Sequence, residues 1–273
     1  GVVCQPNSNG VGVNLLGGII TTSKSSKTTN ITINSGNYGT VYGGNSGGGS
    51  TTHTSLVLNG GTVDALYGGS SSGEEKGDIR ISINGGTVKG YVVGSVAPAG
   101  AYKGSVSIDI TSGRVLHSVV PGMFDTQLTS SICIDLSEKN EFYLGGTASV
   151  DQFKGGGILS LGKNALLTIE GQLFGSTELS IDDPIQRTYV TAPEASSRED
   201  SFHYEPTGTE SLAVALDGAT RTWGISGAGT GTQDELVTVE ITVRPASGTL
   251  TVYKSRLESN KDMLLPIRTQ PIT

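Results

Sequence analysis

A repeat of 25 residues limits most strongly how this chain can fold. Ile31 begins Ile-Thr-Ile-Asn-Ser-Gly, Leu56 begins Leu-Val-Leu-Asn-Gly-Gly and Ile81 begins Ile-Ser-Ile-Asn-Gly-Gly. A second element, Val-Tyr-Gly-Gly at Val41, returns as Leu-Tyr-Gly-Gly and Tyr-Val-Val-Gly at the same step. Such fixed spacing indicates one small structural unit per repeat, stacked on its neighbours. Degenerate copies are expected further along, at Ile108, at Ile132 and within residues 157–181.

Apolar and polar residues alternate within each unit, with Ile81 and Ile83 against Ser82 and Asn84, which is the period of a β-strand. Helical repeats are longer, and the Leu-x-x-Leu-x-Leu frame of a leucine-rich repeat is absent. Gly contributes 41 of 273 residues, which disfavours helices and suits tight turns. The sequence therefore predicts an all-β fold, a right-handed parallel β-solenoid (β-helix) of about 25-residue coils, its hand following from the crossover rule.

The alignment of the repeats predicts a structural role for three sets of equivalent residues. The Asn of each unit is predicted to bond its neighbours in a side-chain ladder, although turn preference alone would also favour Asn there. Thr111 and Asp135 would end that ladder. Gly at the corner is expected to adopt positive φ. One column of inward side chains is expected to contain Ile33, Leu58, Ile83 and Ile110.

Units of the form Ile-x-Ile-Asn-Gly-Gly-Thr-Val followed by Val-Tyr-Gly-Gly resemble the Gly-rich β-helical repeat regions of adhesin-like bacterial cell-surface proteins. The resemblance covers residues 14–122 and extends loosely to about 192. It implies a secreted or cell-surface protein and brings no catalytic residues with it. Because no signal peptide is visible, an exported protein would be present here as a trimmed fragment.

The pattern changes towards the C-terminus. We expect a β-helix repeat domain over 1–192, and a connecting segment with a C-terminal antiparallel β region, a cap or small β domain, over 193–273. Two short strands are predicted around the turn Asp217-Gly218. Alternation at Val237–Val243 predicts a strand that forms a hairpin with Thr249–Lys254. The last residues, 262–273, are expected to be a link to a further domain.

Charge and cysteine content exclude several partners. The net charge of −7 includes no basic cluster, which argues against nucleic acid. No apolar run approaches the roughly 20 residues of a membrane span, so membrane insertion is not expected. Cys4 and Cys133 lack the spacing of a metal site or a redox pair. Two unpaired thiols are favoured, and a disulfide between them stays open.

No arrangement of residues points to an enzyme, and no catalytic, cofactor-binding or metal-binding residue is predicted. The adjacent Asp182 and Asp183 precede Pro184 in a turn, where solvated side chains are the simpler explanation. The three histidines, His53, His117 and His203, lie in unrelated contexts, and no Gly-x-Ser-x-Gly turn accompanies them. The equivalent Tyr42 and Tyr67 would suit sugar stacking, but packing along the coil is the more common role.

Each unit carries its extra residues after the third strand, where stacking should place five loops along one edge of the rod. These loops are Ile19–Lys27, Asn45–His53, Ser70–Gly77, Ser95–Lys103 and Met123–Ser130. They are either a binding surface or merely unconstrained turns, and the binding candidates in them are His53, Glu74, Glu75, Lys76 and Tyr102.

The leading functional hypothesis is a non-catalytic structural or adhesin-like module of the cell surface. Its partners would be a host or polysaccharide surface ligand, or other surface proteins. The alternative is a carbohydrate-binding or carbohydrate-cleaving β-helix protein, similar to polysaccharide lyases or glycosidases.

Overall fold

The chain divides into two compact units, Gly1–Gly231 and Thr232–Thr273, and each is described by itself. The described residues form β-strands and two short 3-10 turns, with no α-helix among them. The computed structural model describes residues 13–18, 25–45, 48–72, 74–97, 102–124, 128–227, 248–258 and 261–272.

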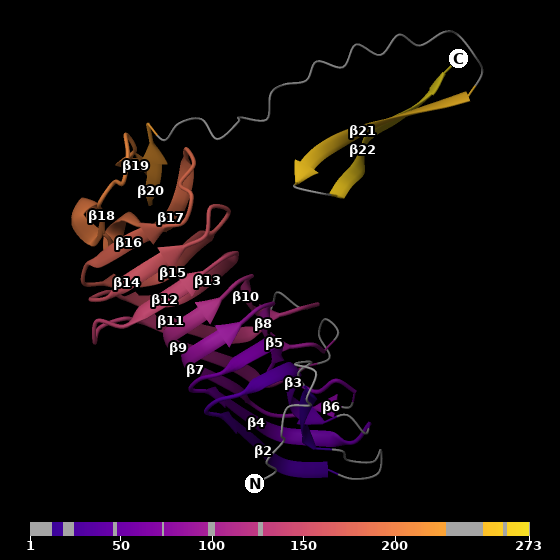
Figure 1. Cartoon of the computed structure of the whole chain (residues 1–273). Coiled ribbons are helices and arrows are strands. Elements are labelled where there is room, and N and C mark those ends of the chain that lie inside the picture. The colour runs from indigo at the N-terminus through magenta and orange to yellow at the C-terminus, as the bar shows by residue number, and fades with distance from the viewer. Residues whose placement is uncertain are drawn as a thin grey trace. The chain divides into compact units, whose positions relative to one another are not determined.

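The first unit is a parallel β-solenoid of about seven turns, as predicted (Figure 1). Three columns of stacked strands form its sides. Column 1 contains β2 (Ser25–Ile33), β4 (Ser50–Leu58), β6 (Glu74–Glu75), the starts of β7 (Ile79–Val88) and β9 (Ser105–Val115), β11 (Thr129–Asp135), and the ends of β13 (Thr147–Lys154) and β15 (Leu166–Phe174).

Column 2 contains the starts of β3 (Asn37–Asn45) and β5 (Thr62–Tyr67), the ends of β7 and β9, β12 (Glu141–Leu144), β14 (Ile158–Leu161), β16 (Thr177–Ile181) and β18 (Phe202–Tyr204). Column 3 contains β1 (Val13–Gly18), the ends of β3 and β5, β8 (Val92–Ser95), β10 (Val119–Gly122), the starts of β13 and β15, and β17 (Arg187–Pro193).

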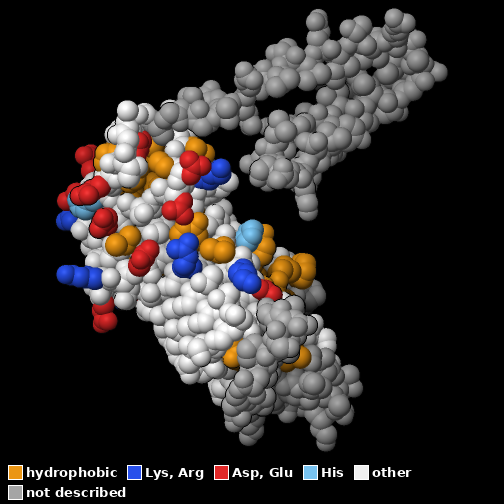
Figure 2. Space-filling view, in the orientation of Figure 1, with side chains coloured by type: hydrophobic (Ala, Val, Ile, Leu, Met, Phe, Trp, Pro, Cys, Tyr) orange, Lys and Arg blue, Asp and Glu red, His pale blue; other side chains and the backbone are white. Residues whose placement is uncertain are grey.

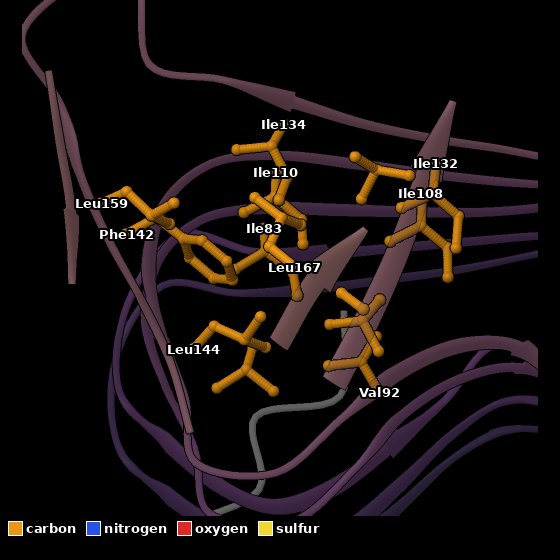
Figure 3. Packing of buried hydrophobic residues seen from close by; sticks show 14 of the residues in the cluster. Ile83, Val92, Ile108, Ile110, Ile132, Ile134, Phe142, Leu144, Leu159 and Leu167 are labelled. Carbon is orange, nitrogen blue, oxygen red and sulfur yellow. The ribbon is translucent and has the colours of Figure 1, made fainter. Parts of the chain in front are cut away.

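The predicted inward column of column 1 is confirmed. Ile33 pairs with Leu58, Leu58 with Ile83 and Ile83 with Ile110, and none of the four is more than 3% exposed. Figure 3 shows Ile83, Ile110 and Ile134 one above another, because Ile134 continues the column one coil further. Strand alternation thus places one apolar residue of every coil against its equivalents in the next.

The corner after column 1 has the predicted geometry. Its four glycines adopt positive φ, and at Gly61 an added Cβ would lie 2.5 Å from the Gly36 carbonyl oxygen. The Asn ladder is also present: Asn59 donates to Asn34 Oδ1 at 2.8 Å, and Asn84 donates to Asn59 Oδ1 at 2.9 Å. The Thr111 hydroxyl then donates to Asn84 Oδ1 at 3.1 Å and completes it. The corner glycines are Gly36, Gly61, Gly86 and Gly113.

The coil length changes along the solenoid. Hydrogen bonds between equivalent positions span 25 residues at Asn34–Asn59, 27 at Asn84–Thr111 and 29 at Ser118–Thr147. Beyond these coils the spacing falls to 19 residues, as between Asp135 and Lys154. The next coils keep the parallel ladder at this shorter spacing, and the last one, in which Thr177 pairs with Phe202, spans 25 residues again, so the solenoid extends further than its sequence signature.

An antiparallel sheet covers the last coil. β20 (Thr220–Ser226) pairs on one side with β17 and on the other with β19 (Ser211–Asp217), which confirms the two strands predicted around Asp217-Gly218. Trp223 is fully buried, its ring 4.9 Å from that of Phe202, and its indole N–H donates to the Glu199 carbonyl oxygen at 3.1 Å. The 3-10 turns are Glu194–Ser196 and Glu199–Ser201. Residues 193–227 therefore pack as part of the same compact unit as the solenoid, which extends to residue 231.

The second unit contains an antiparallel pair, β21 (Gly248–Glu258) and β22 (Lys261–Ile272). Thr249–Lys254 is a strand as predicted, and residues 261–272 pair with it. The interpretation of residues 262–273 as a link is therefore wrong, because the two prolines there do not prevent a strand at a sheet edge. The predicted strand Val237–Val243 lies outside the described residues.

Candidate functional site

The strand ends that flank the variable loops are stacked on one corner, between column 3 of one coil and column 1 of the next. On the column 3 side, Ser95 pairs with Gly122, and the Asn45 N–H donates to Ser70 Oγ at 2.9 Å. On the column 1 side, Ser50 pairs with both Ser25 and Glu74. The loops therefore leave and re-enter the solenoid along one line, which we name the loop edge.

The last loop of the loop edge lies between β10 and β11, in the coil with the 29-residue spacing. β13 runs directly from column 3, where Ala148 pairs with Val119, into column 1, where Phe153 pairs with Ile134. β15 makes the same passage without a loop. Because β13 and β15 have no loop between column 3 and column 1, their coils are shorter, with a spacing of 19 residues between Asp135 and Lys154. The loop edge is therefore confined to residues 19–130. Residues 19–24, 46–47, 73, 98–101 and 125–127 of these loops lie outside the described residues.

Three of the five candidate residues are exposed beside the loop edge. His53 lies on β4, and its Nδ1 accepts the Asp78 N–H at 3.3 Å. Glu74 and Lys76 form an exposed ion pair at 3.1 Å. These side chains are accessible to a ligand, and an exposed ion pair of this kind contributes little to stability.

The other two candidates, Glu75 and Tyr102, are not surface residues, contrary to expectation. Glu75 is 7% exposed: its carboxylate accepts the Ser70 N–H and, at 2.9 Å, the Ser95 hydroxyl, while burial raises its pKa. Tyr102 is 4% exposed, with its hydroxyl 2.7 Å from the Gly77 carbonyl oxygen. Both anchor the roots of the loops. Charge and residue type alone suggested exposure because they do not reveal which side of the corner a side chain occupies.

His53, Asp78 and Ser105 follow one another in successive coils but do not form a nucleophilic triad. The Ser105 hydroxyl donates to Asp78 Oδ1 at 2.7 Å, and this bond is the main cause that lowers the pKa of Asp78. The His53 ring accepts a backbone N–H instead of the serine proton. A triad needs the imidazole to take the proton of the hydroxyl, so this geometry binds the coils together and activates no nucleophile.

Aromatic rings of neighbouring coils also stack on one another, on column 3 and at the corner between columns 2 and 3. The rings of Tyr42 and Tyr67 are 4.9 Å apart and 13° from parallel, and those of Tyr91 and His117 are 5.0 Å apart and 24° from parallel. Tyr91 is 46% exposed. Each of these rings has one face covered by its neighbour, but Tyr42 and Tyr67 are half-buried whereas Tyr91 is exposed, so Tyr91 is the more accessible ring.

Two exposed apolar side chains at the loop edge were not among the residues predicted from the sequence. Met123 is 44% and Phe124 is 62% exposed, directly after β10. Figure 2 shows that hydrophobic side chains, in orange, are exposed at several places on the visible face of the solenoid. An apolar pair within an otherwise polar, variable loop was the available signal, because exposed large apolar side chains often mark contact sites.

The part of the chain that the structure describes holds no group of three or more His, Cys, Asp or Glu side chains suited to a metal ion. Cys133 is half-buried and its thiol is free, and burial raises its pKa. The described residues also include no helix long and apolar enough to cross a membrane. No protein-family model, curated protein or solved structure matches this chain.

Proposed function

We propose that this chain is a non-catalytic, adhesin-like module of a bacterial cell surface, in which a rigid solenoid presents the loop edge to a ligand. One observation carries the proposal: the inserted residues of successive coils share a single corner and are absent from the later coils. A stack of parallel coils holds such loops in place at little entropic cost to binding.

The proposed ligand is a host or cell-surface polysaccharide, or another surface protein, and Phe124 is the proposed apolar anchor. At 62% exposure it has apolar area to lose on contact with a partner, and large aromatic side chains often dominate such contacts. His53 and the Glu74–Lys76 pair supply polar groups beside it along the same edge.

A screen of immobilised polysaccharides and surface proteins, followed by two alanine variants, tests this proposal. Phe124→Ala should weaken binding of any captured ligand by about tenfold or more. Phe174→Ala is the matched control, because this phenylalanine is 45% exposed but lies on β15, beyond the loop edge. Equal binding by the parent and Phe124→Ala, with loss in Phe174→Ala, would exclude the loop edge as the site.

The second candidate is a carbohydrate-binding or carbohydrate-cleaving protein, and exposed Tyr91 favours it. A sugar ring can stack its apolar face on an open aromatic ring, and Leu116 at 37% exposure adds apolar surface nearby along the same corner. For this candidate, Tyr91→Ala should abolish polysaccharide binding while Phe124→Ala leaves it unchanged. Release of new reducing or unsaturated sugar ends by the parent would contradict the non-catalytic proposal.

The proposed extracellular location has its own test. Antibodies against the chain should label intact cells of the source organism, and protease added outside those cells should remove the signal. Labelling that appears only after lysis would contradict a surface location.

A further inference from the structure

The cap sheet ends in an open strand. β19 pairs with β20 from Ser211 opposite Ser226 to Asp217 opposite Thr220, and among the described residues no strand lies on its other edge. Of its seven residues only Leu212 is half-buried, and the other six are exposed. The unpaired N–H and carbonyl groups of such an edge form a template for a further strand.

The residues of β19 do not protect this edge. Leu212 to Leu216 are five consecutive apolar residues, and Val214 and Leu216 are 37% and 50% exposed. Open edges are normally blunted by Lys, Pro or a bulge, and β19 has none of these across its regular pairing with β20. An exposed apolar run of this length on an open edge indicates a binding surface.

The apolar face of β19 continues that of the buried cap. Opposite residues of an antiparallel pair share a face, and Val214 lies opposite Trp223 while Leu212 lies opposite Ile225. Trp223 and Ile225 are at most 2% exposed, whereas Val214 and Leu216 extend their face past the covered area. A strand added to β19 would therefore find both free backbone groups and an apolar row to cover.

We propose that the occupant of this edge is β19 of a second copy of the chain, paired antiparallel about Val214. The strand is complementary to itself in this register: Val214 meets Val214, Leu212 meets Leu216, and Ser211 meets Asp217. The charge of Asp217 then faces a hydroxyl, whereas a register centred on the C-terminal end would bring two carboxylates together. The contact is isologous and closes after two copies, and it joins the two cap sheets into one.

Sedimentation and light scattering of the whole chain over a range of concentrations test this dimer. The parent should be a dimer at about 100 µM and dissociate on dilution. Val214→Lys should be monomeric under the same conditions, because Lys would face Lys across the two-fold axis. Ala213→Lys is the matched control: it faces Ala215 of the other copy, so it should lose far less affinity.

A charge swap at the axis makes the test specific for this register. Val214→Lys and Val214→Glu should each be monomeric, and an equimolar mixture should form a dimer with one of each. Circular dichroism establishes that both variants fold, and hydrogen exchange of the β19 amides in the parent should slow as concentration rises. A parent that stays monomeric, with β19 amides protected at every concentration, would show that the chain covers its own edge and would overturn the proposal. So would a Val214→Lys variant that remains dimeric.

Discussion

Replacement of Leu58 by Ala tests the inward register on which the solenoid depends. Leu58 is fully buried between Ile33 and Ile83, its partners in the two neighbouring coils. Truncation of a buried Leu costs about 2–5 kcal/mol of the free energy of unfolding, and the cost rises with the cavity that remains. Because ladder hydrogen bonds hold the neighbouring coils apart at a fixed spacing, collapse is limited, and we expect about 3–4 kcal/mol.

Val57→Ala is the matched control, since Val57 is the adjacent residue of β4 and points outward, half-buried. Its truncation should cost below about 1 kcal/mol. In a unit of more than 200 residues, each kcal/mol lowers the melting temperature by about 2–4 °C, so Leu58→Ala should melt about 6–16 °C below the parent.

Thermal unfolding followed by circular dichroism, with urea unfolding as a second measure, compares the two variants. A third variant, Leu58→Asp, buries an unpaired carboxylate and should be less stable than Leu58→Ala by several kcal/mol. Equal melting of the Leu58→Ala and Val57→Ala variants would refute the register of β4. A Leu58→Asp variant as stable as the parent would do the same.

Three further predictions concern the corners. In urea unfolding, Asn59→Ala should cost roughly 1–2 kcal/mol because it loses two amide hydrogen bonds, and Asn34→Ala, which loses one ladder bond among the described residues, about half as much. Equal costs would contradict a ladder. Burial raises the native pKa of Glu75 above 4.5, so the parent loses stability as pH rises through that native pKa. Glu75→Gln should therefore match the parent in acid and exceed it near neutral pH, and pH-dependent melting with no such divergence would refute this. Gly61→Ala should cost more in thermal melts than Gly218→Ala: both have positive φ, but only Gly61 lies against a neighbouring coil, while nothing lies within 4 Å of the Cβ position at Gly218.

The candidate site was only partly accessible to sequence reasoning. The position of the loops followed from the repeat, because residues that recur at one step must stack in register. The exposure of His53 and Lys76 agreed with their polarity, but Glu75 and Tyr102 are buried at the loop roots. Their burial depends on contacts with Ser95 and Gly77 in neighbouring parts of the corner, which no single repeat reveals.

The amino-acid sequence by itself determined the fold of each coil, because the repeat length and the alternation of apolar and polar residues are local properties that recur in every repeat. Ile83 faces inward, Asn84 joins the ladder and Gly86 turns the chain for reasons found within a few residues of each. Only the tertiary structure decided where the repeats stop being 25 residues long, because a coil that loses its loop keeps the same strand spacing. It also decided how the stack ends: Trp223 covers the last coil through antiparallel pairing of β20 with β17, a contact between segments about 30 residues apart that no local pattern specifies.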